Sequence, residues 1–297
     1  MRKSGIGAGV RLLLAAALLP FLGALAAAQP AEPPLPPPSA GPVPGLADQV
    51  RQTTSPYTAP KRPDYQAYSP LGLACEVKLT AHAAPGAMAV LQLHAPCLPN
   101  RALTVRHQGL VFSDTTSNIG TFTATVPALT SQATFELKLA DAAAVITSLS
   151  LPEAAHFRRV GLQWSGSDDL QLHVFELNAR SGRKTHLWAG QPQSTARALR
   201  GRGGYLTRLG NAHMADAHQA EIYSFPAGRV HHRTTIRLHL VVPVTRSNCD
   251  QALAAQTLHG TSGGGDISIR MPPCDQIGTD LVLKNLLKDL KISGDQG

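Results

Sequence analysis

Residues 160–176, VGLQWSGSDDLQLHVFE, constrain the fold of this chain more strongly than any other segment. Apolar side chains occupy every second position on both sides of the polar residues 165–168: Val160, Leu162 and Trp164 before them, and Leu170, Leu172 and Val174 after them. This period of two is typical of strands that bury one face. Because Ser, Gly and Asp separate the two runs, the segment predicts a β-hairpin.

Short segments of the same kind recur along most of the chain, separated by turn residues. The strand candidates before the hairpin are Glu76–Ala83, Met88–His94, Leu103–Phe112, Gly120–Val126, Thr134–Leu139 and Ala144–Leu149. Those after it are His186–Ala189, Gly204–Leu209, Ala220–Phe225, Thr234–Val244, Leu253–Leu258 and Asp266–Met271. Many short strands at close spacing predict an all-β fold, with one β-sandwich domain over residues 67–154 and a second over residues 155–297.

The end of the chain has a different period. Leu283, Leu286, Leu287 and Leu290 recur at i, i+3, i+4 and i+7, with lysines between them. This spacing predicts a short C-terminal amphipathic helix that covers the open end of the second sandwich.

The first 28 residues resemble a secretory signal peptide: a basic start, an apolar run and a small-residue site for cleavage between Ala28 and Gln29. The alternative is an uncleaved segment that anchors the protein in the inner membrane. Residues 29–66 are rich in proline and include PPLPPP, so we expect an extended, disordered linker. No later segment approaches about 18 apolar residues, so we expect a periplasmic or secreted protein with no mature membrane span.

The chain has four cysteines, Cys75, Cys97, Cys249 and Cys274. An even number in an exported protein predicts disulfides, and four cysteines allow three connectivities. We favour the local pairs, Cys75–Cys97 and Cys249–Cys274, each of which contributes roughly 3 kcal/mol by closing a short loop.

Charge argues against a nucleic-acid partner. Three of the 27 basic side chains lie in the signal peptide, which leaves 24 against 19 acidic side chains in the mature chain. The remaining formal charge of +5 is scattered, and the densest basic run, Arg197 to Arg208, is interleaved with glycine as in a solvated loop.

A serine motif and several metal-binding side chains are the candidates for chemistry. Gly260–Gly264 matches the G-x-S-x-G nucleophile pattern around Ser262, but it lies between two strand candidates, so we interpret it as a hairpin tip. His213, Asp216 and His218 form the tightest metal-ligand cluster, with His231 and His232 nearby, and Asp168 and Asp169 offer carboxylates to calcium. None of these has the spacing of a known site. We therefore predict no catalytic residue, metal or cofactor.

Further histidines and the large aromatic residues have structural interpretations. His94, His107, His173 and His239 fall inside strand candidates, where we expect them on polar outer faces. Trp164, Trp188, Tyr205 and Tyr223 are candidates for a platform that stacks on sugars. Trp164 shares the face of Val160 and Leu162, so we assign it to the core, and the position of Trp188 stays open.

Two patterns resemble modules of exported proteins. The stretch from Val111 to Leu129 resembles secreted Ig-like modules with a "v…t…G.f…vPal" pattern, which implies a scaffold. Asp169–Val174 resembles the "DLDLHV" strand of exported bacterial β-sandwiches similar to prepeptidase-type jelly rolls; Gly203–Leu206 and Ala220–Tyr223 match the "GG.L" turn and "AE.Y" strand that follow it. Gln171 replaces the second aspartate of that pattern, which weakens the case for a metal there.

As a whole, the chain resembles a family of exported alphaproteobacterial proteins, some of which carry the label translocase. No nucleotide-binding motif supports transport. The sequence therefore predicts an exported, disulfide-stabilised, non-catalytic binding or scaffold protein of the bacterial cell envelope, with a protein or polysaccharide partner. The alternatives are a secreted hydrolase whose active site has no recognisable pattern, and a carbohydrate-binding module.

Overall fold

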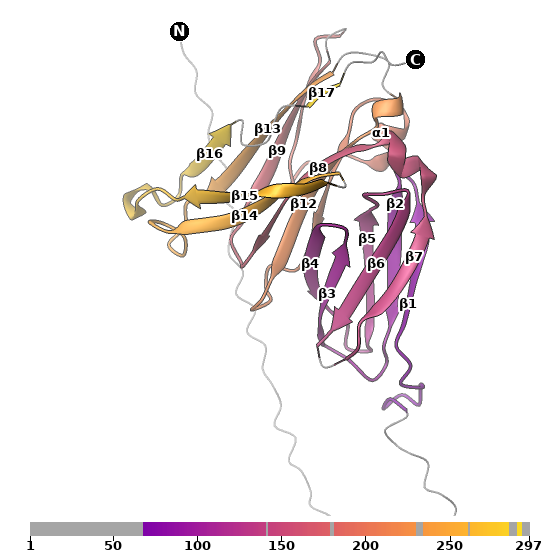
Figure 1. The fold of residues 1–297 in the computed structure, drawn as a ribbon. Coiled ribbons are helices and arrows are strands. Elements are labelled where there is room, and N and C mark those ends of the chain that lie inside the picture. Colours follow the sequence, from indigo (N-terminus) through magenta and orange to yellow (C-terminus); the bar gives the residue numbers. More distant parts are fainter. Residues whose placement is uncertain are drawn as a thin grey trace, which may run out of the picture. The chain divides into compact units, whose positions relative to one another are not determined.

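The described part of the chain folds into antiparallel β-sheets and contains very little helix (Figure 1). The computed structural model describes residues 68–140, 142–178, 181–229, 234–260, 262–284 and 290–292, all within one compact unit, Pro60–Gly297. The expected signal peptide, the Ala28–Gln29 cleavage site and the whole proline-rich linker lie outside these residues. No helix among the described residues has the length and apolar character needed to cross a bilayer.

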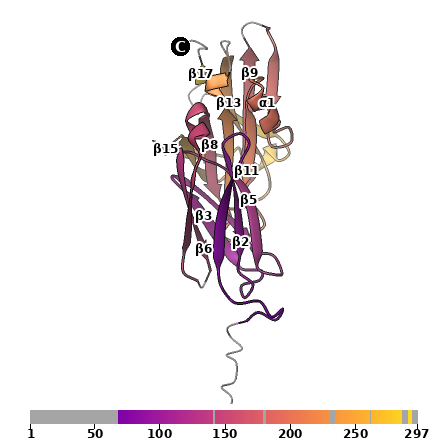
Figure 2. The ribbon, with the colours of Figure 1, turned by 90° about the vertical axis from the view of Figure 1, so that its right-hand side faces the viewer.

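Residues 78–150 form two sheets that enclose an apolar core (Figures 1 and 2). One sheet has the order β1-β2-β5, with strands Lys78–Ala84, Met88–His94 and Thr121–Pro127. The other has the order β4-β3-β6-β7, with strands Leu110–Thr115, Ala102–His107, Gln132–Leu139 and Val145–Ser150. The sequence predicted β3 and β4 as one strand, but residues 108–109 turn the chain back, and Gln108 adopts a φ of 54° there.

Two further sheets contain the remaining strands. One has the order β11-β12-β8-β14-β15, with strands Tyr205–Leu209, His218–Phe225, Arg158–Ser165, Ala252–His259 and Ser262–Arg270. The other has the order β10-β9-β13-β16, with strands Lys184–Leu187, Gln171–Asn178, Thr234–Pro243 and Asp280–Lys284, and β17 (Leu290–Ile292) also pairs with β13. The short helices of the described residues are η2 (Pro152–His156), α1 (Thr195–Leu199), η3 (Ala227–Arg229) and η4 (Cys274–Gln276).

Residues 160–176 form two strands, as predicted, but the strands do not pair as a hairpin. β8 and β9 belong to different sheets, and residues 166–170 carry the chain from one sheet to the other. The inward side chains meet across the core: Val160 clusters with Leu172 and Val174, and Trp164 clusters with Leu170. The hairpin prediction was wrong because alternation predicts that one face of a strand is buried but does not identify the strand with which it pairs.

The predicted C-terminal helix is also wrong over the residues that the structure describes. Asp280–Lys284 forms β16 and Leu290–Ile292 forms β17, and both pair with β13. Leu281 and Leu283 pack on the core while residues 280, 282 and 284 are exposed, which is the alternation of a strand. Residues 285–289, which contain the middle leucines of the predicted stripe, are outside the described part.

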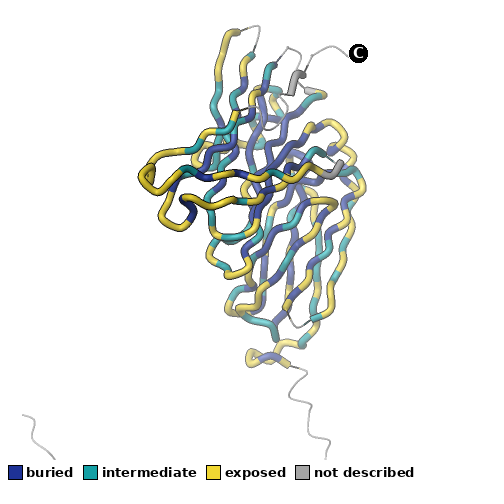
Figure 3. The backbone as a smooth tube through the Cα atoms, turned by 60° about the vertical axis from the view of Figure 1, so that its left-hand side comes forward, coloured by how far each residue is buried: buried dark blue, intermediate teal, exposed yellow. Residues whose placement is uncertain are grey.

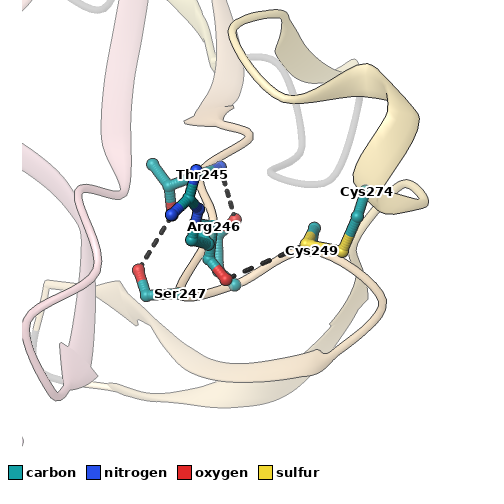
Figure 4. Close-up of a disulfide and its surroundings, with 6 residues drawn as sticks. Thr245, Arg246, Ser247, Cys249 and Cys274 are labelled. Carbon is teal, nitrogen blue, oxygen red and sulfur yellow. Dashed lines mark hydrogen bonds between the residues drawn. A yellow bond between two sulfur atoms is a disulfide. The ribbon is translucent and has the colours of Figure 1, made fainter.

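Both local disulfides are present, and each joins the two ends of one hairpin. Cys75–Cys97 flanks β1 and β2, and Cys249–Cys274 flanks β14 and β15, with Cα–Cα distances of 5.2 and 5.0 Å. The loop before Cys249 is held by its own polar groups (Figure 4). Asn248 accepts a hydrogen bond from the Thr245 backbone at 2.8 Å and donates one to the Pro243 carbonyl at 3.0 Å.

The first pair of sheets shares its core with the second. Buried residues line the strands of both pairs (Figure 3), and one apolar cluster joins Leu91 and Phe135 to Tyr205 and Ile222. The Tyr205 hydroxyl donates to the Gly86 carbonyl at 2.7 Å, across 119 positions of sequence. Burial of these groups therefore stabilises both pairs of sheets together.

Candidate binding face on the β10-β9-β13 sheet

The outer face of the β10-β9-β13 sheet carries a cluster of rings. Along β9, Leu172, Val174 and Glu176 are buried beneath the sheet, which turns His173 and Phe175 outward. The register places His186 of β10 opposite Phe175, and His239 of β13 opposite His173. We call the five side chains His173, Phe175, His186, Trp188 and His239 the ring face.

These rings stack on one another while remaining partly exposed. The Phe175 and His186 rings are nearly parallel, with centroids 4.4 Å apart and an interplanar angle of 5°. His173 stacks on Trp188 at 5.7 Å, and His239 lies 4.9 Å from Phe175. Mutual stacking fixes the rings before any ligand arrives, which lowers the entropy that binding would lose.

A hollow of about 240 Å³ adjoins the ring face and combines apolar and cationic groups. It is lined by Phe175, Glu176, Leu177, Lys184, Thr235, Arg237 and His239. Lys184 and Arg237 are exposed, so hydrogen-bond donors border the rings. A shallow site with rings beneath and donors at its rim suits a ligand that has both apolar and polar surfaces.

A chain of polar contacts orients the two central histidines. Gln171 donates from its amide nitrogen to Asp169, and its amide oxygen lies 3.2 Å from Nε2 of His173. This arrangement assigns a proton to Nε2 of His173 and leaves a lone pair on Nδ1. Nδ1 of His173 in turn lies 3.0 Å from Nε2 of His186.

Both histidines are held neutral. Burial lowers the pKa of His173, and the neighbouring His186 lowers it further. Burial also lowers the pKa of His186. At neutral pH these imidazoles therefore act as uncharged rings with one donor and one acceptor each.

A buried ion pair supports the sheet from below. Glu176 pairs with Arg197 at 2.6 Å and also accepts hydrogen bonds from the Tyr223 hydroxyl at 2.8 Å and the Gly204 backbone at 2.6 Å. Burial, and then the charge of Glu176, raises the pKa of Tyr223 well above its usual value. Gly203 is required here, since a Cβ at this position would overlap the Glu176 carboxylate and the Arg197 guanidinium.

A second carboxylate, Glu221, lies fully buried where the two sheets approach one another. It accepts a hydrogen bond from the Leu172 backbone at 2.6 Å, and Arg208 reaches it at 3.4 Å. Arg208 also pairs with Asp169 at 2.8 Å. Burial is the main cause that raises the pKa of Glu221 to about 7.

The four aromatic candidates for a sugar-stacking platform do not come together on one exposed face. Trp164, Tyr205 and Tyr223 are all buried, and Trp164 donates to the Asp168 carbonyl at 2.8 Å. Of the four, only Trp188 is partly exposed, and it lies against rings that the sequence did not associate with it. The alternation of β9 could have identified these rings, because it assigns His173 and Phe175 to the face opposite Leu172 and Val174.

The metal candidates do not converge. His213 and Asp216 are exposed, and the His218 ring contacts Ser165. The Asp169 carboxylate is engaged by Arg208 and Gln171, which leaves it poorly suited to calcium. Among the described residues, the only group of three or more His, Cys, Asp and Glu side chains whose ligand atoms cluster is Cys249, Asp250 and Cys274, and its sulfurs are already joined as a disulfide. His231 and His232 lie outside the described residues.

The histidines expected on outer faces divide into two groups. His94 is exposed and His173 and His239 are partly exposed. His107 is buried, which contradicts the expectation. Its Nδ1 lies 2.9 Å from the Thr134 carbonyl, and its Nε2 accepts from the Leu129 backbone at 2.8 Å.

Two serines bear on hydrolytic chemistry. Ser262 begins β15 directly after the β14–β15 turn, so the G-x-S-x-G match occurs within a hairpin and not at a strand-to-helix turn. Ser165 lies 3.0 Å from Nδ1 of His218 in an open groove of about 490 Å³. No carboxylate among the described residues hydrogen-bonds to that histidine, so the orienting group of a catalytic triad is missing from the described part.

No protein-family model and no curated protein matches this sequence.

Proposed function

We propose that this protein is a non-catalytic binding protein of the bacterial cell envelope, which recognises a polysaccharide through the ring face. The observation that carries the proposal is the stacked, partly exposed set of Phe175, His186, His173 and Trp188 on one open sheet. Ring faces pack against the C–H surfaces of sugars, and neighbouring donors bind the hydroxyl groups.

Charge favours an acidic polysaccharide. Among the described residues of this sheet, Lys184, Arg237 and Lys284 are exposed on its outer side, beside the exposed carboxylate of Asp280. A polymer that carries carboxylates would gain electrostatic attraction in addition to stacking.

The covalent structure and the expected leader support the compartment that we propose. Two disulfides fit a protein exported into an oxidising environment. Together with the signal peptide expected over residues 1–28, they support the proposal of a periplasmic or secreted protein. We also propose that residues 160–225 correspond to the sandwich module of exported bacterial proteins that they resemble.

Affinity electrophoresis of the mature chain in gels that contain alginate, dextran or no polymer tests the proposal. We expect alginate to retard the wild type, and Phe175→Ala or Trp188→Ala to weaken that retardation on the order of tenfold in affinity, because each removes a stacking surface. Ile146→Ala, at an exposed apolar position on β7, is the matched control and keeps full retardation.

Equal retardation of all four proteins would show that binding occurs elsewhere. A wild type that no acidic or neutral envelope polysaccharide retards would contradict the polysaccharide assignment altogether.

A further inference from the structure

Two imidazole nitrogens on the ring face are spaced as ligands of one metal ion. Nδ1 of His173 and Nε2 of His186 lie 3.0 Å apart. Metal–nitrogen bonds of about 2.0–2.1 Å at angles between square-planar and tetrahedral place adjacent ligand nitrogens about 2.9–3.4 Å apart. The pair therefore matches the spacing of adjacent ligands without any change of backbone.

The contact network directs a lone pair of His173 toward this position. Gln171 accepts from Nε2 of His173, and Asp169 holds the Gln171 amide in the orientation that makes this possible. A histidine that binds a metal usually donates its other ring N–H to such a partner, which fixes the tautomer and the ring orientation. In the metal-free protein Nε2–H of His186 donates a hydrogen bond to Nδ1 of His173. On metal binding His186 takes its other neutral tautomer, with the proton on its own Nδ1, so that Nε2 offers a lone pair to the metal.

The rings are also held in place by packing. His186 stacks on Phe175, and His173 stacks on Trp188. The two histidines come from adjacent strands, β10 and β9, whose register pairs His186 with Phe175, two positions from His173. Preorganisation of this kind reduces the ordering that metal binding requires.

We propose that His173 and His186 bind a first-row divalent metal ion, with Cu²⁺ preferred over Zn²⁺ according to the general affinity order for nitrogen ligands. Nδ1 of His173 and Nε2 of His186 supply two coordination positions, and the others are open to water or to a ligand from outside the protein. This assignment does not depend on polysaccharide binding.

Titration of the purified, folded mature chain with CuCl₂, and separately with ZnCl₂, tests the site at neutral pH. We expect Cu²⁺ to quench the fluorescence of Trp188, which stacks on His173, with saturation at one ion per chain. His186→Phe keeps the stack on Phe175 but removes the ligand nitrogen, so it abolishes the saturable quenching. Gln171→Leu weakens the metal affinity measured by this quenching by about 10–100-fold, as the loss of an orienting hydrogen-bond partner does in other metal sites.

His94→Phe, at an exposed histidine of β2, is the control and retains the wild-type titration. A second measurement uses only the wild type: Zn²⁺ is expected to protect His173 and His186, but not His94, from acylation by diethyl pyrocarbonate. The proposal is overturned if His186→Phe quenches like the wild type, or if Zn²⁺ leaves the acylation of both histidines unchanged.

Discussion

His107 is a buried imidazole whose two nitrogens both have backbone partners, the Thr134 carbonyl and the Leu129 amide. Its ring also packs at 4.4 Å against Phe135. Burial lowers the pKa of His107, because the charged form would lose water and one of its two hydrogen bonds. The sequence pattern of β3 could not show that His107 is buried, because histidine counts as a polar residue in such patterns. A neutral imidazole can nevertheless lie in a core when both of its nitrogens have hydrogen-bond partners.

We predict that His107→Phe lowers the free energy of unfolding by at least about 2 kcal/mol at pH 8, because two buried backbone groups lose their partners. Since the folded pKa lies below the unfolded value, the contribution of His107 is complete above about pH 6.5 and declines as the pH falls below it. Phenylalanine does not titrate, so the difference between wild type and variant should narrow at lower pH. Urea unfolding of both proteins between pH 5 and 8 checks this; a constant difference would contradict it.

Glu221 should show the opposite pH dependence. Its pKa is raised from 4.5 to about 7, so the folded state binds the proton more tightly than the unfolded state. Its contribution is therefore complete below about pH 4.5 and is lost as the pH rises through 7. Glu221→Gln keeps an acceptor for the Leu172 backbone but does not titrate. We therefore expect the free energy of unfolding of this variant to rise, relative to that of the wild type, by up to about 3 kcal/mol between pH 5 and 8. A difference that stays flat over this range would show that Glu221 remains ionised.

At the scale of single elements, residue patterns predicted most strands but not their partners. Met88–His94 matched β2 at both ends because a Pro-Gly turn precedes it and a disulfide follows it. Alternation identified β8 and β9, yet the same alternation fits a hairpin and a connection between facing sheets. At the C-terminus, Leu281 and Leu283 carried the strand signal, but the leucines at 283, 286, 287 and 290 fit a helical period more fully. Pairing with β13 supplied the information that the local sequence lacked.

The disulfides act on elements, since each closes one hairpin. We predict that replacing Cys249 and Cys274 together with serine lowers the free energy of unfolding by about 2–4 kcal/mol, mainly by enlarging the unfolded ensemble. The Cys75→Ser, Cys97→Ser double variant should lose a similar amount, because its loop is nearly as long, with separations of 22 and 25 residues. Chemical denaturation of the oxidised proteins measures both losses, and a double variant as stable as the wild type would contradict this account.

At the scale of the molecule, the two pairs of sheets are coupled by a buried arginine. Arg159 of β8 donates to the carbonyls of Gly86, Ala87 and Ala128, which belong to the first pair of sheets. It also donates to Ser224 at 3.1 Å. The sequence predicted two sandwich domains. No local pattern could show that the buried side chains of Arg159 and Tyr205 bind backbone carbonyls of the first pair of sheets, more than 30 positions away in the sequence.

We predict that the wild type unfolds in a single transition and that Arg159→Met lowers its free energy of unfolding by about 3 kcal/mol, since three buried carbonyls lose the hydrogen bonds that the charged guanidinium donates to them. Tryptophan fluorescence reports the second pair of sheets, where Trp164 and Trp188 lie, and hydrogen exchange of β2 and β6 amides reports the first. Coincident transitions are expected for the wild type. Two separate transitions would mean that the sandwiches fold independently.

The central claim is that ligand binds on the ring face, and the two tryptophans provide an internal comparison for it. Trp188 belongs to the ring face, whereas Trp164 is buried and its indole N–H is bound to the Asp168 carbonyl. Titration of the ¹⁵N-labelled chain with alginate oligosaccharides should shift the indole signal of Trp188 progressively and leave that of Trp164 in place. Saturable binding that moves neither indole signal, or only that of Trp164, would contradict the claim.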